Sequence, residues 1–338
     1  FIDSCSMPTC RDVPAVALAT LKPLSVTGTA LGGTPFICRR YGSPPPPMLT
    51  ATKGSAARGE RTRQFDTPVN ALAWSAGGPV VAAYFLDRTA VFVLGEETLL
   101  FVPPKGDTQR FDIHSGGILS AKSDGTRVVT GGDDGKVVST DAKGESKTIA
   151  TDSKRRWIDE VAVGPDGAVA WSAGKTAFMQ SGKNEPKSLD LPSSVGGLAF
   201  APKGIRVAVA HYGGVSLWFP NVQGKPEFLE WKGSHHHVAY SPDGKFLVTA
   251  MQEPALHGWR VADAKHMRMS GYSARVRSFG WTAGGKWLAT AGSEQLVMWP
   301  FQSKDGPMGK SPKLLAPTET KVAQVAQDGL ARAANPSH

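Results

Sequence analysis

A short motif recurs six times along this chain of 338 residues, at intervals of 37 to 47 residues. Each copy ends in a turn glycine, and a large, a small and a large residue precede it, as in Leu-Ala-Phe at residues 198–200. Such alternation predicts a β-strand whose two faces meet different surroundings. The six turn glycines are Gly78, Gly125, Gly167, Gly204, Gly244 and Gly285.

The repeat length indicates one architecture. A period of about 40 residues, filled with short strands and tight turns, is typical of the four-stranded blades of a β-propeller. The small residue stands five positions before every glycine, which suggests crowding where the innermost strands converge on an axis. Trp218, Trp259 and Trp299 follow their glycines by 14 or 15 residues, in a predicted third strand. We therefore predict an all-β propeller with six recognisable repeats and the start of a truncated seventh.

Two stretches carry a resemblance to a known family. YSPDGKFLVTA (Tyr240 to Ala250) and VVTGGDDGKVV (Val128 to Val138) resemble the repeats of WD-repeat β-propellers. The resemblance is to divergent, bacterial-type repeats, because the Asp of the Trp-Asp pair is missing and no Gly-His pair precedes the first strand. It implies a hydrogen-bonded His-Asp-Ser/Thr-Trp clamp, which we expect to be weakened here. The residues in place of the missing Asp are Phe219, Arg260 and Pro300.

We divide the chain into three parts. Residues 1–62 are a leader without repeats, expected to be a disordered arm or an extension upstream of a natural start at Met48. Residues 63–316 form the WD-type propeller. Residues 317–338 form an incomplete seventh repeat or an irregular tail. The stretch RTRQF (Arg61 to Phe65) is a candidate for the outer strand that closes the ring.

The net charge of +9 raises the question of nucleic-acid binding. Residues 1–63 hold eight Lys and Arg and three acidic residues, so more than half of the excess charge lies outside the propeller. The propeller is only mildly basic, and it has no run of Lys and Arg with interleaved aromatic residues. We expect no specific nucleic-acid binding.

Cysteine usage and hydropathy bear on the compartment. Cys5, Cys10 and Cys38 all lie in the leader, so the propeller has no disulfide framework. No apolar run is long enough for a transmembrane helix, and the run from Ala15 to Leu21 lacks the basic flank of a signal peptide. We expect a cytoplasmic protein with no membrane partner.

No catalytic motif stands out. The chain has no Gly-x-Ser-x-Gly elbow, no His-Glu-x-x-His and no paired Cys motif. Asp124, Asp166 and Asp243 recur at the same turn of several repeats, so we interpret them as turn formers. We expect no enzymatic activity, no catalytic residue and no cofactor, with zinc as the one alternative.

Three consecutive histidines, His235 to His237, begin the predicted innermost strand of the fifth repeat. Alternation places His235 and His237 on one face and His236 on the other. Neutral imidazoles that converge within a few ångströms bind zinc. Two interpretations stay open. The histidines are polar residues of an ordinary strand, which we favour, or they join His211 and His257 in a metal site comprising His211, His235, His237 and His257.

Arginine and aromatic residues occur in three loops of the rim on which these histidines are predicted to lie. Arg, Trp and Tyr are enriched among the residues that dominate protein–protein binding energy. A rigid scaffold that presents loops is also suited to holding a partner. The predicted partner-binding rim comprises Arg155, Arg156, Trp157, Tyr212, Tyr272, Arg275 and Arg277.

The sequence thus predicts a non-enzymatic protein-binding or scaffolding propeller that uses one rim of its disc. Its partner is expected to be a protein with an acidic surface. The alternative is a propeller with a metal-dependent or enzymatic site at the rim of repeats four and five, built from the four histidines named above.

Overall fold

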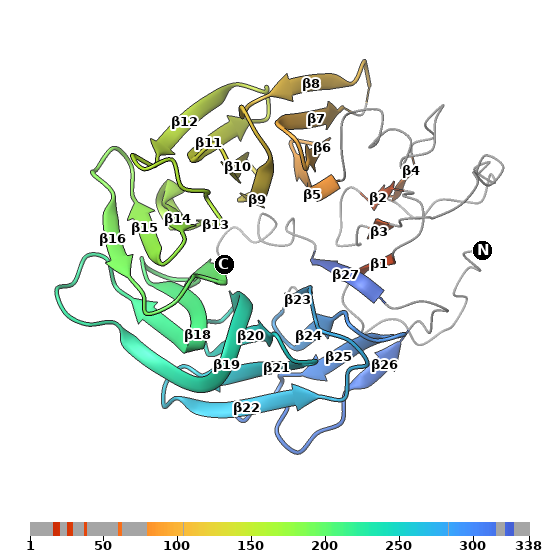
Figure 1. Cartoon of the computed structure of the whole chain (residues 1–338). Helices are drawn as coiled ribbons and strands as arrows, with labels where there is room; N and C mark the ends of the chain where they lie inside the picture. The colour runs from red at the N-terminus through yellow and green to blue at the C-terminus, as the bar shows by residue number, and fades with distance from the viewer. Residues whose placement is uncertain are drawn as a thin grey trace, which may run out of the picture.

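The computed structural model describes residues 82–103, 105–282 and 284–315, and the backbone of residues 16–20, 26–29, 37–38, 60–62, 80–81 and 322–327. Antiparallel sheets stand side by side around a central axis, like the blades of a propeller (Figure 1). Apart from one 3-10 turn, η2 (Pro165–Gly167), the described elements are strands. The prediction of an all-β propeller with four-stranded blades is confirmed.

Four of the blades are sheets of four strands in chain order. The first blade comprises β5 (Val80–Leu86), β6 (Thr89–Leu94), β7 (Thr98–Val102) and β8 (Gln109–Asp112); the second β9 (Ile118–Ser123), β10 (Arg127–Gly132), β11 (Lys136–Asp141) and β12 (Ser146–Thr151); the third β13 (Glu160–Val163), β14 (Val169–Ala173), β15 (Thr176–Gln180) and β16 (Lys187–Asp190); and the last β23 (Phe279–Trp281), β24 (Trp287–Thr290), β25 (Leu296–Pro300) and β26 (Lys313–Leu315).

Repeats four and five share one continuous sheet of six strands. The first part of its long strand β19 pairs with β18, and the second part pairs with β20, so one strand serves both repeats. Five sheets therefore form the blades in the described part of the chain, and the prediction of six separate blades is corrected to five. The strands are β17 (Gly197–Phe200), β18 (Val207–Trp218), β19 (Glu227–Tyr240), β20 (Phe246–Met251), β21 (Ala255–Arg260) and β22 (Lys265–Ser270).

The phase of the first repeat also differs from the prediction. Strand β5 contacts β9, the innermost strand of the next blade, so β5 is itself innermost. Its hairpin turn is Asp87-Arg88, with φ of 42° and 67°, and a two-residue turn with positive φ at both positions matches the twist of a hairpin. The turn predicted at Gly78 is therefore not the hairpin turn of this blade. The first strand predicted around Leu72 lies outside the described residues.

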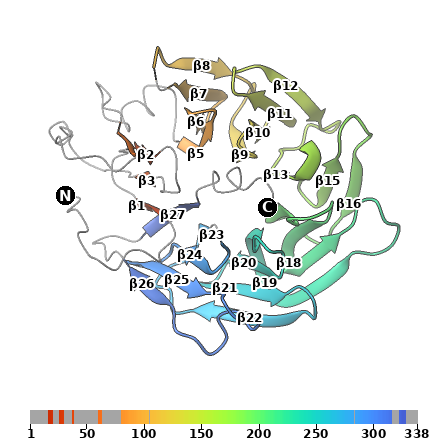
Figure 2. The ribbon, with the colours of Figure 1, turned by 180° about the vertical axis from the view of Figure 1, so that it is seen from behind.

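Strands from distant parts of the chain meet where the ring closes. Strand β1 (Val16–Thr20) pairs antiparallel with β27 (Val322–Gln327), and β27 contacts β23. Both views place this pair between the last blade and the first (Figures 1 and 2). The partner of β27 is therefore β1, whereas RTRQF was the predicted closing strand. A separate three-stranded sheet consists of β2 (Val26–Thr29), β3 (Ile37–Cys38) and β4 (Glu60–Thr62).

The innermost strands approach one another closely, as the small residues in the repeat predict. Val161 N donates a hydrogen bond of 3.2 Å to Ser120 Oγ of the neighbouring blade. His237 N donates one of 3.0 Å to Gly196 O, and a Cβ atom on Gly197 would lie only 2.9 Å from His237 N. Backbones at this distance leave no room for large side chains between them.

Buried polar side chains clamp the second blade. His114, which precedes β9, has its Nε2 2.8 Å from Thr130 Oγ1 on β10 and its Nδ1 3.0 Å from Asp134 Oδ1 in the next turn. His, Asp and Thr are thus bonded as in the clamp that the resemblance implies, but Ser139 and Thr140 stand where other repeats have tryptophan. His114 was not predicted, because Ile113 precedes it and the two glycines come after Ser115, so no Gly-His pair is present.

Two further clamps vary this chemistry. In the shared sheet, His235 Nδ1 lies 2.8 Å from Thr249 Oγ1. In the last blade the hydroxyl of Tyr272 replaces histidine: it lies 2.7 Å from Thr290 Oγ1 and accepts a hydrogen bond of 2.6 Å from Trp299 Nε1. The clamps thus form although no Asp follows any of the repeat tryptophans.

Candidate functional site

One rim of the propeller carries two kinds of loop, as predicted: those that precede the innermost strands and those that join second and third strands. Backbone hydrogen bonds join them, for example Val195 N to Gly174 O at 2.9 Å and Ala274 N to Gly292 O at 3.0 Å. We call this edge the loop rim. In the described chain it comprises residues 95–97, 113–117, 133–135, 152–159, 174–175, 191–196, 212–214, 231–234, 252–254, 271–278 and 291–295.

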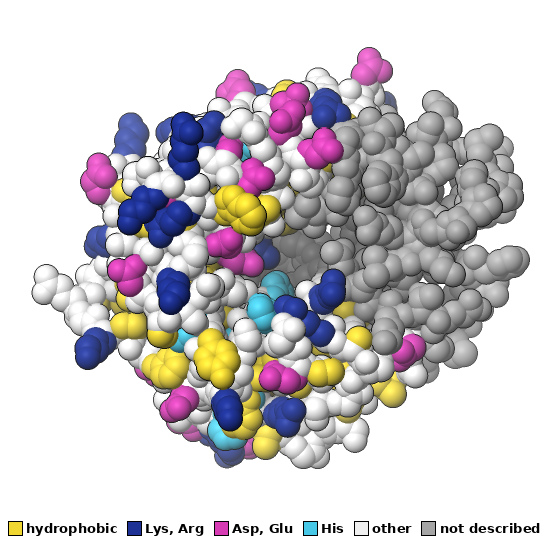
Figure 3. All heavy atoms as spheres, viewed as in Figure 1, with side chains coloured by type: hydrophobic (Ala, Val, Ile, Leu, Met, Phe, Trp, Pro, Cys, Tyr) yellow, Lys and Arg dark blue, Asp and Glu magenta, His cyan; other side chains and the backbone are white. Residues whose placement is uncertain are grey.

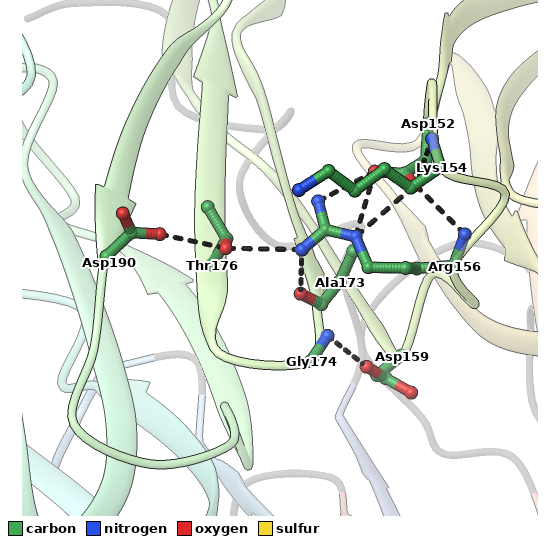
Figure 4. A network of polar contacts seen from close by, with 8 residues as sticks. All are labelled: Asp152, Lys154, Arg156, Asp159, Ala173, Gly174, Thr176 and Asp190. Carbon is green, nitrogen blue, oxygen red and sulfur yellow. Dashed lines mark hydrogen bonds and ion pairs between the residues drawn. The ribbon is translucent and has the colours of Figure 1, made fainter.

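The loop between β12 and β13 is braced by a polar network (Figure 4). The Arg156 guanidinium donates to both carboxylate oxygens of Asp152, with Nη2 2.8 Å from Oδ1, and Nη1 donates to Ala173 O at 3.2 Å and to Thr176 Oγ1 at 3.3 Å. Asp152 Oδ2 also accepts from the backbone N of Lys154 at 3.0 Å. The network ties the loop to the hairpin of the third blade and holds it in one conformation.

This brace presents two predicted residues to solvent. Trp157 is 61% exposed, and Arg155 is exposed with a φ of 53°. A left-handed conformation is uncommon for a residue with a large side chain and persists only where its surroundings impose it. Arg155 N donates 3.0 Å to Asp152 O, which helps to impose it here. Lys154 is exposed beside them.

Arg156, also a predicted partner-binding residue, is engaged within the protein. Its hydrogen bonds hold Asp152, whose side chain is only 5% exposed. The Arg156 guanidinium lowers the pKa of Asp152, and the carboxylate in turn raises the pKa of Arg156. A bidentate pair of this kind fixes geometry. Arg156 therefore positions its neighbours in the loop.

We expect Arg156→Ala to lower the free energy of unfolding by about 1–2 kcal/mol, because it leaves the buried carboxylate of Asp152 without its charged partner. Arg155→Ala, at the adjacent exposed position, should change it by less than about 0.5 kcal/mol. Urea unfolding of the two variants measures both. Equal losses would mean that the exposed arginine is as structural as the bonded one.

A second exposed aromatic group lies three rim segments further along the chain, in β18. Tyr212 is 58% exposed, and its backbone N donates 2.9 Å to Ser193 Oγ. Phe228, 47% exposed, stacks on the ring of buried His211 with centroids 5.5 Å apart. A Cβ atom on Gly213 would lie 3.9 Å from the tip of Phe228, so the Tyr212 turn adjoins this ring. Sequence analysis missed Phe228 because it lies within an outer strand.

The remaining predicted rim residues divide in the same way. Tyr272 is 8% exposed and belongs to the clamp of the last blade, and burial raises its pKa to about 12. It is therefore structural and not an exposed contact. Arg277 is exposed and Arg275 half-buried, and Val276 between them is fully buried. The Arg277 side chain thus reaches solvent, whereas Arg275 Nε is buried.

The four candidate metal ligands do not converge. His211 uses both ring nitrogens, on Tyr212 O and Ser216 Oγ, each at 2.9 Å. His235 does the same with Thr249 Oγ1 and Trp231 O. Their ring nitrogens are thus committed to protein partners. Across residues 82–103, 105–282 and 284–315, no group of three His, Cys, Asp or Glu side chains is arranged to hold a metal ion.

The other two candidates lie in different surroundings. His237 stacks edge-on against Phe279, with centroids 4.6 Å apart, and burial lowers its pKa to about 3. His257 is fully buried, and neither ring nitrogen has a hydrogen-bond partner within the described chain. Its ring stacks on Trp231 at 3.9 Å and lies 6.4 Å from that of His235. The strand interpretation of His235 to His237 accounts for their backbone, which pairs with β20 in a regular ladder apart from one bulge.

The centre of the disc holds polar groups that sequence analysis did not single out. Figure 3 shows a hollow there, with histidine, acidic and basic side chains at its wall. Glu160 begins the innermost strand β13, and burial raises the pKa of its carboxyl to about 7, while Lys122 of β9 acts in the opposite direction. His236 begins the equivalent strand in β19. The repeat pattern did not set His236 apart, because the residues eight positions before the other turn glycines include the polar Asn70, Asp159 and Arg277.

Comparison of the chain with known protein families and with curated protein sequences finds no match. No helix in the described part of the chain is long and apolar enough to cross a membrane.

Proposed function

We propose that this propeller is a non-enzymatic binding module of the WD-repeat type that captures an acidic protein partner on its loop rim. The repeat pattern and the His-Thr-Asp clamp of the second blade support the family assignment. Because the propeller sequence has no cysteine, it suits a reducing cytoplasm. The observation that carries the binding proposal is Trp157, a large aromatic side chain 61% exposed on a braced loop.

Energetics favour a binding role for such a side chain. Burying a tryptophan contributes about 2–3 kcal/mol, and tryptophan and tyrosine are the commonest binding hot spots. The Asp152–Arg156 brace holds Trp157 ready, so little conformational entropy is lost when a partner binds. Tyr212 and Phe228 supply a second apolar anchor on the same rim.

Charge selects the partner. Lys154, Arg155 and Lys175 are exposed near Trp157, and none of them has an ion-pair partner among the described residues. The nearby Asp152 and Asp190 are engaged by Arg156 and Thr176. An acidic segment with apolar side chains complements this surface, because opposite potentials speed encounter and fix register.

A matched pair of variants tests the proposal. We expect Trp157→Ala to weaken the affinity for the partner by about 30-fold, which corresponds to about 2 kcal/mol. Leu314→Ala removes a similarly exposed apolar side chain on β26, away from the loop rim, and should leave affinity unchanged. Both variants should unfold at the wild-type temperature. The partner is first captured from the source cells by cross-linking, then purified for calorimetry.

The same two variants can contradict the proposal. A captured protein that binds Trp157→Ala and Leu314→Ala equally well does not use the loop rim. Salt provides a second check, since attraction between exposed charges weakens above physiological ionic strength. An affinity that is the same in 0.05 M and 0.5 M salt would rule out an acidic partner.

A further inference from the structure

Cationic and imidazole groups occur together where the second half of β19 adjoins the loop before β23. Figure 3 shows a histidine side chain with basic side chains next to it at the edge of the central hollow. The contributing segments are the start of the second half of β19, the loop after β20 and the loop before β23. We propose that His236, Arg275 and Arg277 bind a single oxyanion, such as a carboxylate or a phosphate group, at the mouth of the central hollow.

The side chains of Arg275 and Arg277 have no hydrogen bond or ion pair to another described residue, and Arg275 Nε is buried without an acceptor there. An unpaired guanidinium with a buried, unsatisfied donor is costly unless something else supplies an acceptor. Guanidinium groups match carboxylate and phosphate oxygens in geometry as well as charge. An oxyanion is thus the ligand that this pair lacks.

Backbone packing holds the arginine loop firmly. A Cβ atom on Gly292 would lie 3.0 Å from Ala274 O and 3.2 Å from a methyl group of Val276, so the loop packs directly on the turn after β24. His236 and Arg277 each stand eight residues before the turn glycine of their repeat, and His237 next to His236 packs on Phe279 of β23 with centroids 4.6 Å apart. The ligand would therefore meet preset groups, which lowers the entropic cost of binding.

His236 adds a group that can gain a proton. Its Nε2 lies 3.2 Å from Ser234 Oγ, and its Nδ1 lies 3.3 Å from where a Cβ of Gly196 would stand. Burial lowers the pKa of His236, and Arg275 lowers it further, while Gln252 and Glu253 in the loop after β20 act in the opposite direction. An oxyanion between His236 and Arg275 would offset the repulsion from the arginine and favour the imidazolium. Binding would then take up a proton.

Because oxyanion binding is coupled to proton uptake, the direction in which affinity changes with pH is fixed. His236 is neutral at pH 7 in the free protein, because its pKa is below the ordinary value. If the ligand raises that pKa, affinity must increase as pH falls, by at most about tenfold per pH unit for one proton. Sulfate is a suitable probe, because it carries the same charge throughout the range from pH 6 to pH 8.

NMR titration with sulfate at constant ionic strength tests the site. We expect saturable shifts of the amides of residues 275–277 and of the His236 ring, and an affinity at least about threefold higher at pH 6.0 than at pH 7.5. Arg277→Gln, at an exposed position with little risk for folding, should weaken sulfate binding by about tenfold. Arg268→Gln, also exposed but on β22, is the matched control and should have no effect.

His236→Gln separates the imidazole from the arginines. It should retain sulfate binding at pH 7.5 and lose the increase at pH 6.0. Acetate titrated in parallel distinguishes a carboxylate site from one that requires a tetrahedral anion. Absence of saturable binding of either anion, or binding unchanged in Arg277→Gln, would overturn the site. Trp157→Ala should leave sulfate binding intact, so failure of the partner proposal and of this one are distinguishable.

Discussion

Gly196→Ala is expected to be among the most destabilising single substitutions in this propeller, with a loss of about 3 kcal/mol. A Cβ atom on Gly196 would overlap the carbonyl oxygen of His235, and that oxygen belongs to the backbone of the neighbouring innermost strand. A backbone atom cannot turn aside as a flexible side chain does. The substitution must therefore separate β17 from β19, which also breaks the 3.0 Å hydrogen bond from His237 N to Gly196 O.

Gly284→Ala is the matched control. It is also a glycine next to a turn, but a Cβ there would meet nothing closer than Lys286 Cγ at 4.0 Å. Urea unfolding should show a change of less than about 0.5 kcal/mol for this variant. If Gly196→Ala is as stable as Gly284→Ala, the innermost strands are not packed as closely as described, and the position of His236 beside Gly196 fails with them.

The repeat period predicts the propeller because a fixed spacing of turn glycines allows only a stack of equal units. The spacing of glycines does not locate the hairpin turn of the first blade. There the hairpin turn is Asp87-Arg88, two residues without glycine, so counting from glycine selected Gly78 instead. The outer strand β8 reads QRFD and is largely exposed, which hides it from any search for apolar alternation.

Residue type did not predict which of the rim side chains are exposed and which are buried. Trp157 and Arg155 are exposed as expected, but neighbouring Arg156 is held by Asp152, and Tyr272 is buried in a clamp. Arginine and tyrosine serve interfaces and internal networks with the same groups. Only the contacts of the folded chain separate these roles.

The histidines show the same difficulty more strongly. Consecutive histidines on a strand predict only that alternate rings share a face. His235 is in a clamp with Thr249, and His236 lies beside Gly196 of the neighbouring innermost strand. These outcomes depend on which loops of other repeats pack nearby, and the repeat pattern does not predict these contacts.

Acidification is expected to destabilise the fold, and His257 is expected to account for much of the effect. Burial lowers the pKa of His257 to about 3, assisted by the positive charges of His235, His266 and Arg268. In the unfolded chain its pKa is near 6.5. Below pH 6.5 the unfolded chain therefore binds a proton that the folded chain does not. Stability is fully present above that pH and is lost as pH falls, by about 1.4 kcal/mol per pH unit.

Other groups modify this slope. His237, with a pKa lowered to about 3, adds a loss of the same sign. Glu160 acts in the opposite direction: its pKa is raised to about 7, so the folded chain takes up a proton before the unfolded chain does as pH falls towards 4.5. One histidine and Glu160 nearly cancel between pH 6.5 and pH 5.0. The pKa values of His114, His211, His235 and His236 are also lowered by burial, so these groups add losses of the same sign. We expect a net loss of about 2 kcal/mol or more over that interval, measured by urea unfolding at several pH values.

His257→Leu should raise stability at pH 7 by about 1–3 kcal/mol, because it removes two buried ring nitrogens that have no partner in the described chain while keeping an apolar side chain under Trp231. It should also remove most of the loss between pH 6.5 and pH 5.0. His114→Leu is the matched control. His114 is equally a buried histidine, but both its nitrogens are bonded, to Thr130 and Asp134, so its replacement should cost about 2 kcal/mol or more. If both variants lose stability alike, His257 has hydrogen-bond partners in the folded protein, and the acid sensitivity must have another source.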